Sequence, residues 1–334
     1  MRHPPDPPAT LEVRGLSVTF RTRGGPVPAV RDVDLDVAPG ELVALLGESG
    51  SGKSVTARAV MGLNPGNATV TAGRVRLRDT DLLSLPDKQL RRIRGSRMSL
   101  VFQDALSALN PVLSVGDQIG ELFREHRGET RRAARAHAVD LLAQVGIPAP
   151  ARRIGDYPHQ FSGGMRQRIL IAMAIALRPE LLIADEPTTA LDVTVQAQIL
   201  ELLDGLRREL HMAVLLITHD LGVVSEVADR VAVMYAGRIV ESGDADAVLG
   251  RPAHPYTQAL LRSVPRADLN GQDLYAIPGS PPVPTRLPAG CPFHPRCAWA
   301  VDACRSTRPE PRPVADGRAT ACHRSSEVLD AVAG

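Results

Sequence analysis

Apolar and polar residues alternate along several short stretches of the chain, as they do in half-buried β-strands. Two stretches, 181–184 and 213–218, are almost wholly apolar, which is typical of strands buried on both faces of a parallel sheet. The pattern predicts strands at residues 11–20, 37–47 (two strands around a turn at Pro39-Gly40), 73–79, 97–103, 181–184, 213–218 and 230–242 (a hairpin that turns at Ala236-Gly237).

Helical periodicity fills most of the remaining sequence. The pattern predicts helices from residue 55 onward, through most of 114–177 with a break at 146–158, over 193–210, and as one short helix within 254–264. Strands that alternate with helices indicate a mainly parallel sheet covered by helices. We therefore expect an α/β fold.

Length and composition narrow the class of protein. The 334 residues allow one large α/β domain with an appended module, or two medium domains. Hydrophobic residues make up 44% and charged residues 23%, which is ordinary for a soluble protein. The formal charge of +2 gives no reason to expect binding to nucleic acid.

No apolar run approaches the ~18–20 residues that span a bilayer, and the polar, proline-rich start does not resemble a signal peptide. We expect a protein inside the cell that meets a membrane only through partners.

A glycine-rich loop between a predicted strand and a predicted helix fits the pattern G-x-x-x-x-G-K-S/T. Glycines let successive backbone N–H groups point at phosphate oxygens, and the following helix presents its positive N-terminus to the same anion. The lysine supplies a point charge, and the serine hydroxyl is an oxygen ligand suited to Mg²⁺. The loop residues are Gly47, Glu48, Ser49, Gly50, Ser51, Gly52, Lys53 and Ser54.

The apolar strand at 181–184 runs into two carboxylates, Asp185 and Glu186. A parallel strand that ends at a phosphate site delivers its last side chains there. Asp185 could then hold Mg²⁺ through water, and Glu186 could act as the general base that polarises the attacking water. An apolar strand that ends in Asp-Glu is common, so this motif gains its meaning from the phosphate loop about 130 residues earlier.

Residues 161–168, between the loop and the acidic strand end, read Phe-Ser-Gly-Gly-Met-Arg-Gln-Arg. By itself, Ser-Gly-Gly before a helix would be an ordinary N-cap. In this position the segment resembles the signature motif of ABC-type ATPases, with Ser162, Gly163 and Gly164 at its centre. Met165 stands where the usual form has Gln, and methionine here is familiar in the peptide-import branch of the family.

The other motifs of this family follow in order. The resemblance assigns Gln103 to the Q-loop, which contacts Mg²⁺ and senses the membrane partner, and Ala190-Leu191-Asp192 to the D-loop, which crosses between two subunits. It assigns His219 to the switch histidine that contacts the γ-phosphate. Phe20 is a candidate for the aromatic residue that stacks on adenine, and a side chain that faces the core is an equally good interpretation.

The resemblance spans residues 11 to about 245. It implies a P-loop NTPase of the ABC type, with a mainly parallel core sheet, an antiparallel β subdomain and a helical subdomain at about 104–175. It also implies that two such domains meet head to tail, so that the phosphate loop of one and the signature of the other enclose each ATP. ATP closes the pair, hydrolysis reopens it, and the helical subdomain relays the motion to a membrane subunit. Every catalytic position is present, so we expect a competent ATPase.

Residues 254–261 and 291–297 resemble the region that follows the ATPase domain in oligopeptide and dipeptide import ATPases. We therefore expect a nucleotide-binding domain at 1–250 and a C-terminal region at 251–334, joined by a linker near 265–285. The resemblance implies two transmembrane permease subunits, a second ATPase subunit (more often a different chain than a copy) and an extracytoplasmic solute-binding protein. It places the chain at the cytoplasmic face of the cell membrane as a peripheral subunit. The same branch also serves nickel and some other small solutes.

All four cysteines lie in the last 44 residues, with five, six and seventeen residues between neighbours. We expect them to form a short C-terminal module at about 285–325. In a reducing compartment such clustering favours metal or cluster binding over disulfides. The C-x₂₋₄-C pairs usual for structural zinc are missing. Four thiolates can hold an iron-sulfur cluster of the 4Fe-4S type, and some members of this branch resemble cluster carriers here. Zn²⁺ and free or disulfide-linked thiols stay as alternatives. The residues are Cys291, Cys297, Cys304 and Cys322.

Three other kinds of protein share part of this pattern. A soluble ABC ATPase that acts on DNA or ribosomes usually carries long coiled-coil insertions or two sets of motifs, and this chain has neither. A regulatory module that binds ATP without hydrolysis does not need both Glu186 and His219. Exporter motors are often fused to membrane spans, which this sequence lacks, so the resemblance in the tail favours an importer.

Overall fold

The computed structural model describes residues 8–189, 191–263, 275–315 and 317–333, which divide into two compact units. Unit 1 comprises residues up to 11, 37–41 and 76–217, and unit 2 comprises 12–36, 42–75 and 218 onward. Ala190 of the expected D-loop, the first seven residues and the first half of the expected linker lie outside the described residues.

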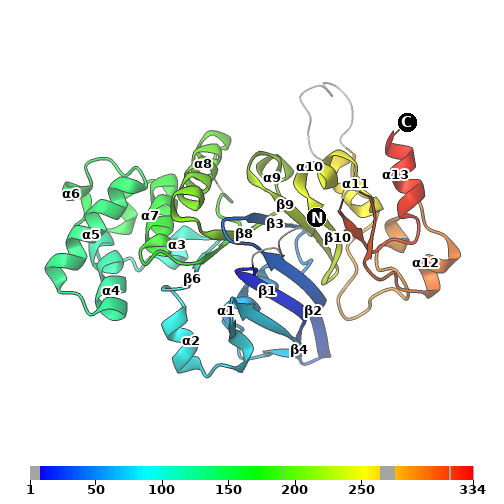
Figure 1. Ribbon diagram of the computed structural model, residues 1–334, viewed down its shortest axis with the longest axis horizontal. Helices are drawn as coiled ribbons and strands as arrows, with labels where there is room; N and C mark the ends of the chain where they lie inside the picture. Colours follow the sequence, from blue (N-terminus) through cyan, green and yellow to red (C-terminus); the bar gives the residue numbers. More distant parts are fainter. Residues whose placement is uncertain (1–7, 190, 264–274, 316, 334) are drawn as a thin grey trace, which may run out of the picture. The chain divides into compact units, whose positions relative to one another are not determined.

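Unit 1 is built around parallel strands with a group of helices beside them (Figure 1). β7 (Leu181–Asp185) pairs in parallel with β6 (Met98–Val101) and β8 (Ala213–Thr218), with Leu181 opposite Met98 and Ala213. All five residues of β7 are buried, as its apolar sequence predicts.

Helices account for most of the rest of unit 1. α4 packs against α5, and both contact α7, which also lies against α8 and β6. The elements are η1 (Leu82–Ser84), α2 (Asp87–Ile93), α3 (Ala105–Ala108), α4 (Val115–Arg127), α5 (Arg131–Gln144), α6 (Pro150–Arg153), η2 (Pro158–Gln160), α7 (Gly163–Ile175) and α8 (Val193–Leu210). The mostly helical pattern expected at 114–177 and the helix expected at 193–210 are confirmed, although the expected break at 146–158 contains the short helix α6. The bounds of a helical subdomain at about 104–175 stay a prediction.

Unit 2 holds the β1–β2 hairpin and a second group of paired strands. In one sheet β1 (Leu11–Thr22) lies between β2 (Gly25–Val37) and β4 (Ala68–Leu77). The last two residues of β4 belong to unit 1 and pair there with β5 (Thr80–Asp81). In the other, β3 (Leu42–Leu46) pairs in parallel with β9 (Arg230–Tyr235), and β9 pairs antiparallel with β10 (Arg238–Asp244). The hairpin expected at 230–242 is therefore confirmed.

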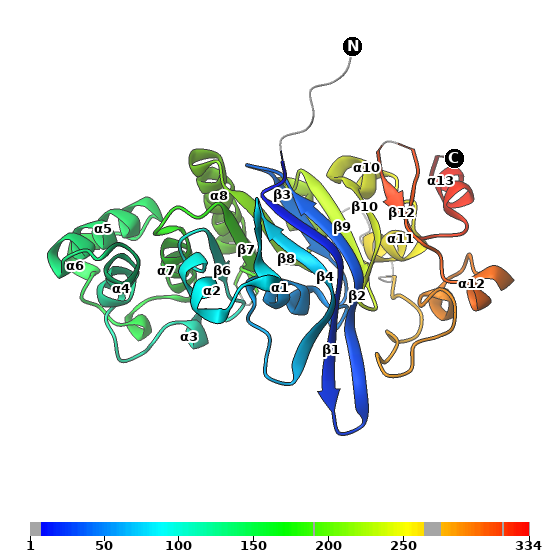
Figure 2. The same ribbon diagram turned by 60° about the horizontal axis from the view of Figure 1, so that its bottom comes forward.

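The C-terminal residues belong to the same sheet and core of unit 2. β12 (Ala319–Thr320) adds to the edge of β10 (Figure 2) and pairs antiparallel with β11 (Arg312–Pro313). The core here gathers Val231, Val233 and Tyr235 of β9 with Tyr256 and Phe293 from the C-terminal region. The helical elements are α1 (Lys53–Met61), α9 (Leu221–Val227), α10 (Ala245–Gly250), α11 (Pro255–Arg262), η3 (His294–Arg296), α12 (Asp302–Ser306) and α13 (Ser325–Ala333).

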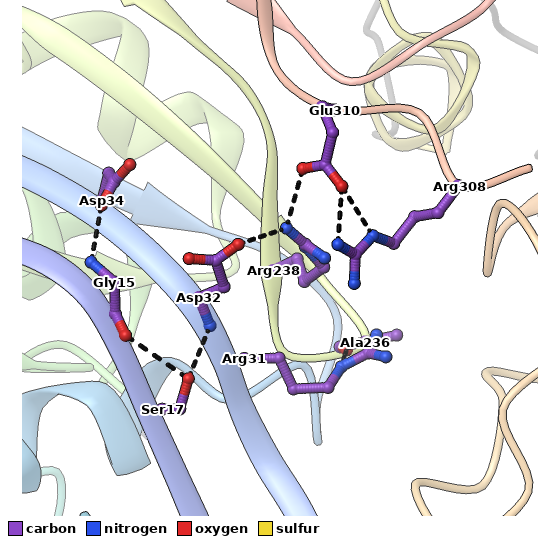
Figure 3. A network of polar contacts seen from close by, with 9 residues as sticks. All are labelled: Gly15, Ser17, Arg31, Asp32, Asp34, Ala236, Arg238, Arg308 and Glu310. Carbon is purple, nitrogen blue, oxygen red and sulfur yellow. Dashed lines mark hydrogen bonds and ion pairs between the residues drawn. The ribbon is translucent and has the colours of Figure 1, made fainter. Parts of the chain in front are cut away.

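An arginine at the β9–β10 turn joins three parts of unit 2 (Figure 3). The Arg238 side chain is only 8% exposed, and its guanidinium donates to Asp32 of β2 at 2.9 Å and to Glu310 at 3.2 Å. Burial and the nearby guanidinium groups of Arg238 and Arg308 lower the pKa of Arg31 to about 10. The C-terminal region is thus joined to the β9–β10 hairpin by an ion pair as well as by strand pairing.

Candidate nucleotide-binding and hydrolysis site

The sequence-predicted residues fall into two groups, one in each compact unit. In unit 2 the phosphate loop joins the buried strand β3 to α1, as expected, with Lys53 as the first residue of the helix. Gly52 has φ 111, and a Cβ there would come within 2.7 Å of the Ala29 carbonyl oxygen. Only glycine therefore fits at this position of the loop.

Lys53 is 5% exposed, and its ammonium lies over the loop. Its Nζ donates to the carbonyl oxygens of Gly47 at 2.7 Å and Glu48 at 3.1 Å. The charge therefore sits beside the N-terminus of α1, and both favour an anion at this end of the helix. The arrangement is suited to the phosphates of a nucleotide.

Glu48 makes two contacts that the sequence did not predict. Its N–H donates to the Tyr256 hydroxyl at 2.8 Å, and its carboxylate accepts from both terminal nitrogens of Arg296 at 2.8 and 3.0 Å. Both partners lie in the segments that resemble the peptide-import tail, but no local pattern links them to a loop 208 and 248 residues earlier.

The other candidates of unit 2 are less constrained. His219 follows β8 directly and is exposed. Phe20 is half-buried on β1, two and four residues after the buried Val18 and Leu16 and so on the same face. This position is compatible with both interpretations of Phe20.

In unit 1 the acidic strand end and the Q-loop glutamine come together. Asp185 is 7% exposed at the end of β7. The next residue, Glu186, has φ 49, which is uncommon for a non-glycine residue, and its N–H donates to Ile217 of β8 at 2.8 Å. Its carboxylate accepts from Gln103 Nε2 at 2.9 Å and from Thr189 Oγ1 at 3.0 Å. The backbone and two hydrogen bonds thus fix the predicted general base.

The signature segment forms the start of α7. Ser162 caps the helix by accepting from the N–H of Met165 at 3.4 Å, and Ser162 and Gly163 are exposed. A Cβ at Gly164 would lie 2.6 Å from Val195 Cγ1 of α8, so the close approach of the two helices requires glycine here. An exposed helix N-terminus can donate to an anion presented by another molecule.

Asp192 of the expected D-loop has a local structural role. Its Oδ1 accepts from the N–H of Val195 at 2.9 Å, which caps α8. This contact accounts for the residue within one chain and leaves its expected role between subunits a prediction.

The four cysteines of the C-terminal region line one pocket of unit 2 together with Phe293. Burial raises the pKa of Cys297 to about 11 and that of Cys322 to about 12. No group of three or more His, Cys, Asp or Glu side chains within the described part of the chain is arranged to hold a metal ion. The shared pocket agrees with the clustering of the cysteines in the sequence, and the binding of a cluster or metal ion there stays a prediction.

Comparisons with known proteins agree with these features. Residues 30–189 match the ABC transporter family, and residues 240–304 match the oligopeptide/dipeptide transporter C-terminal region. The dipeptide transport ATP-binding protein DppD of Bacillus subtilis (strain 168) is 54% identical over 300 residues, which are 90% of each chain. The chain belongs to the ABC transporter family. A putative peptide import ATP-binding protein of Brucella melitensis biotype 1 is 51% identical over 330 residues, 95% of this chain and 98% of that one.

Solved structures of ABC proteins have the same fold. The ATP-binding cassette MJ0796, in a post-hydrolysis dimer with ADP and Pi, superposes with a TM-score of 0.63 at 28% identity over 70% of this chain and 98% of that chain. The cbiO1 protein of Clostridium perfringens, part of the cbiONQ transporter complex, gives 0.62 at 25% identity over 72% and 91%. The predicted ABC-type P-loop fold is confirmed, and as a member of this family the chain is an ATPase that uses ATP and Mg²⁺.

Proposed function

We propose that the chain is the ATP-hydrolysing motor of an importer that carries di- and oligopeptides across the cytoplasmic membrane. The hydrogen bond of 2.9 Å between Gln103 and Glu186 carries the proposal, because it joins the residue expected to sense the membrane partner to the expected general base. The names of the relatives and the match of residues 240–304 to the oligopeptide/dipeptide transporter region support peptides as the cargo.

Each motif residue then has a role, in a nucleotide-binding domain at 1–250 followed by a C-terminal region at 251–334. The loop from Gly47 to Ser54 binds the phosphates, and Phe20 stacks on the adenine. The residues that would hold Mg²⁺ are Ser54, Gln103 and Asp185, and the bound ion would neutralise part of the phosphate charge. The residues that face a second motor across the nucleotide are Ser162, Gly163, Gly164, Met165 and Asp192.

The proposed chemistry rests on this chain's own side chains. Glu186 accepts a proton from the water whose oxygen bonds to the γ-phosphorus, while the bond from that phosphorus to the bridging oxygen breaks and ADP leaves. The two hydrogen-bond donors of Glu186 hold its carboxylate in place before the reaction. Lys53 and the N-terminus of α1 stabilise the charge that develops on the phosphate oxygens. His219 contacts the γ-phosphate as the switch histidine, and this contact ends when the phosphate leaves.

The partners follow from the same proposal. Two transmembrane permease subunits, a second motor of a related sequence and an extracytoplasmic solute-binding protein complete the importer. No helix among the described residues is long and apolar enough to cross a bilayer. We place the chain at the cytoplasmic face of the membrane as a peripheral subunit, with no nucleic acid partner.

The test is capture of the complex. Glu186→Gln should trap the ATP-bound closed state, because binding is kept while hydrolysis is blocked. The variant, purified from native membranes with ATP, should bring two polytopic subunits, a sister ATPase and a binding protein that carries peptide. A binding protein loaded with nickel or another small solute would correct the substrate. Recovery only with ribosomes or DNA would overturn the transporter assignment.

We also propose that the cysteine pocket holds a 4Fe-4S cluster with a structural role. Four thiols around one pocket match the ligand set of such a cluster. The raised thiol pKa values reflect burial, and bound iron would supply the positive charge that favours thiolates. Anaerobic purification should give about four iron and four sulfide per chain, and Cys322→Ala should lose them. One Zn²⁺ per chain, or four titratable thiols with no iron, would overturn this assignment.

A further inference from the structure

Glu48, in the phosphate loop, is a meeting point between the nucleotide site and the C-terminal region. All of its polar groups are engaged: the N–H by the Tyr256 hydroxyl, the carbonyl by the Lys53 ammonium, and the carboxylate by Arg296. Displacement of Glu48 would therefore move the carbonyl that holds Lys53. Two of these three contacts come from residues more than 200 positions away in sequence.

Arg296 is anchored independently of Glu48. Its side chain is 4% exposed, its Nε donates to the Pro278 carbonyl at 2.9 Å, and its Nη1 also lies 3.3 Å from the Tyr235 hydroxyl. The hydrogen bonds that Arg296 donates to Glu48 raise the pKa of Arg296. A buried, bidentate arginine–carboxylate pair is geometrically specific, unlike an exposed ion pair.

Tyr256 is fully buried, and its ring packs at 4.5 Å from Tyr235 and 5.4 Å from Phe293, measured between centroids. The ring position is therefore set by the core, and the hydroxyl reaches the loop from a fixed point. Residues 278–295 form a Pro-rich segment that approaches the same loop. Its Pro281, Pro282 and Pro284 line a pocket together with residues 48–51.

Arg296 is adjacent in sequence to a cysteine that lines the cysteine pocket. Arg296 ends η3, the single turn between Cys291 and Cys297, and both cysteines line that pocket. The Cys291 N–H donates to the Cys304 carbonyl at 2.9 Å, which ties this turn to α12. A change in how the four thiols are held would therefore move the base of Arg296.

We propose that Arg296 and Tyr256 are positioning residues of the phosphate loop, and that the cysteine pocket sets ATP affinity through Arg296. The inference rests on the proposed function of the loop. It gives the C-terminal region a role in the ATPase cycle of its own chain. Tyr256 and Arg296 hold the N–H and the carboxylate of Glu48, and Lys53 holds its carbonyl.

The first test uses Arg296→Met and Tyr256→Phe in the full chain, assembled with its partner subunits. Each should raise the KM for ATP roughly fivefold or more, with kcat changed much less. Arg296→Lys should recover part of the loss because it keeps a positive charge. Arg286→Met is the matched control, since Arg286 is an exposed arginine of the same Pro-rich segment. Values of KM equal to that of the control would overturn the proposal.

Two double variants separate positioning from general loss of structure. In a Glu48→Gln background, Arg296→Met should have little further effect on KM, because the ion pair is already broken. Cys322→Ala should raise the KM of the wild-type chain but add little to Arg296→Met. Additive effects in either pair, with normal unfolding temperatures, would overturn the coupling.

Lys53→Ala distinguishes this inference from the proposed function. If Lys53→Ala binds a fluorescent ATP analogue normally, the assignment of the loop itself fails. If Lys53→Ala abolishes binding while Arg296→Met and Tyr256→Phe behave as the control does, only the present inference fails.

Discussion

At the scale of single residues, Glu186 combines an unusual backbone conformation with two side-chain donors. Such conformations persist only where the surroundings enforce them. Here the hydrogen bond from the Glu186 N–H to the Ile217 carbonyl does so. Glu186→Gln should lower the rate of ATP hydrolysis at least about 100-fold. ATP binding should persist, because the amide oxygen can still accept from Gln103.

The matched control for this prediction is Thr189→Val. It removes one hydrogen bond to the Glu186 carboxylate but keeps the base, so hydrolysis should fall much less. The measurement is the steady-state ATPase rate with a parallel nucleotide titration. Equal losses in the two variants would mean that Glu186 is held for structure and is not the base.

Gly164 offers a second test at this scale, with its neighbour as control. Gly164→Ala should destabilise the chain by about 1–3 kcal/mol, because the new Cβ would lie 2.6 Å from Val195 Cγ1. At Gly163 the nearest atom is Leu191 Cδ2 at 3.6 Å, an ordinary contact, so Gly163→Ala should cost less. Adding Val195→Ala should restore stability to the first variant only. Denaturant unfolding gives the free energy of unfolding of the unsubstituted chain and of each glycine variant, with and without Val195→Ala. An equal loss of stability at the two glycines would contradict the packing argument.

The residues that could be predicted are those whose signal is local. The phosphate loop, the acidic strand end and the cap at Ser162 each depend on a few consecutive residues. The pairing of Glu48 with Arg296 spans 248 positions and leaves no local mark. The bond between Gln103 and Glu186 could be anticipated only from family resemblance, because the two residues end different strands.

At the scale of elements, the strands and helices with strong patterns were predicted within a few residues, and the weak ones were missed. β7, β8 and α8 have long apolar or amphipathic runs. β11 and β12 have two residues each and exist because β12 pairs with β10, so no periodicity can reveal them. Strand β2 pairs with β1, and the pattern predicted no strand over its residues before 37.

The start of α11 leads to a prediction about pH. His254 is 1% exposed, and its Nδ1 accepts from the N–H of Tyr256 at 3.0 Å. Burial lowers the pKa of His254 to about 3 in the folded state, against an ordinary value of about 6.5. Above pH 6.5 both states are neutral and the residue has no effect. Below it only the unfolded state takes up a proton, so stability falls as the pH drops from about 6.5 toward 3.

The loss from His254 should reach about 1.4 kcal/mol per pH unit within that window. His254→Asn keeps an acceptor for the Tyr256 N–H but does not titrate, so its unfolding free energy should fall less steeply. The buried Glu241, whose pKa burial raises, is present in both chains. Urea unfolding at several pH values gives the two slopes, and equal slopes would show that His254 is protonated in the folded state.

At the scale of the whole molecule, the C-terminal region completes unit 2. It was predicted as a following region with its own module, and that division stays a prediction. The contacts nevertheless run into the ATPase part: β12 extends the sheet at β10, Glu310 pairs with Arg238, and Tyr256 and Phe293 pack on Tyr235. Loss of this region would expose the edge of β10 and the apolar side of β9.

A chain shortened to residues 1–250 keeps every ATPase motif and tests this dependence. Burial of each aromatic side chain stabilises the fold by about 1.5–3 kcal/mol, and the shortened chain loses this stabilisation. The unfolding temperature should therefore fall by about 10 °C or more. Co-expression of residues 251–334 should restore stability, because the missing strand, ion pairs and rings return to their places. A shortened chain that unfolds at the temperature of the full chain, with an unchanged KM for ATP, would show that the C-terminal region is an independent appendage.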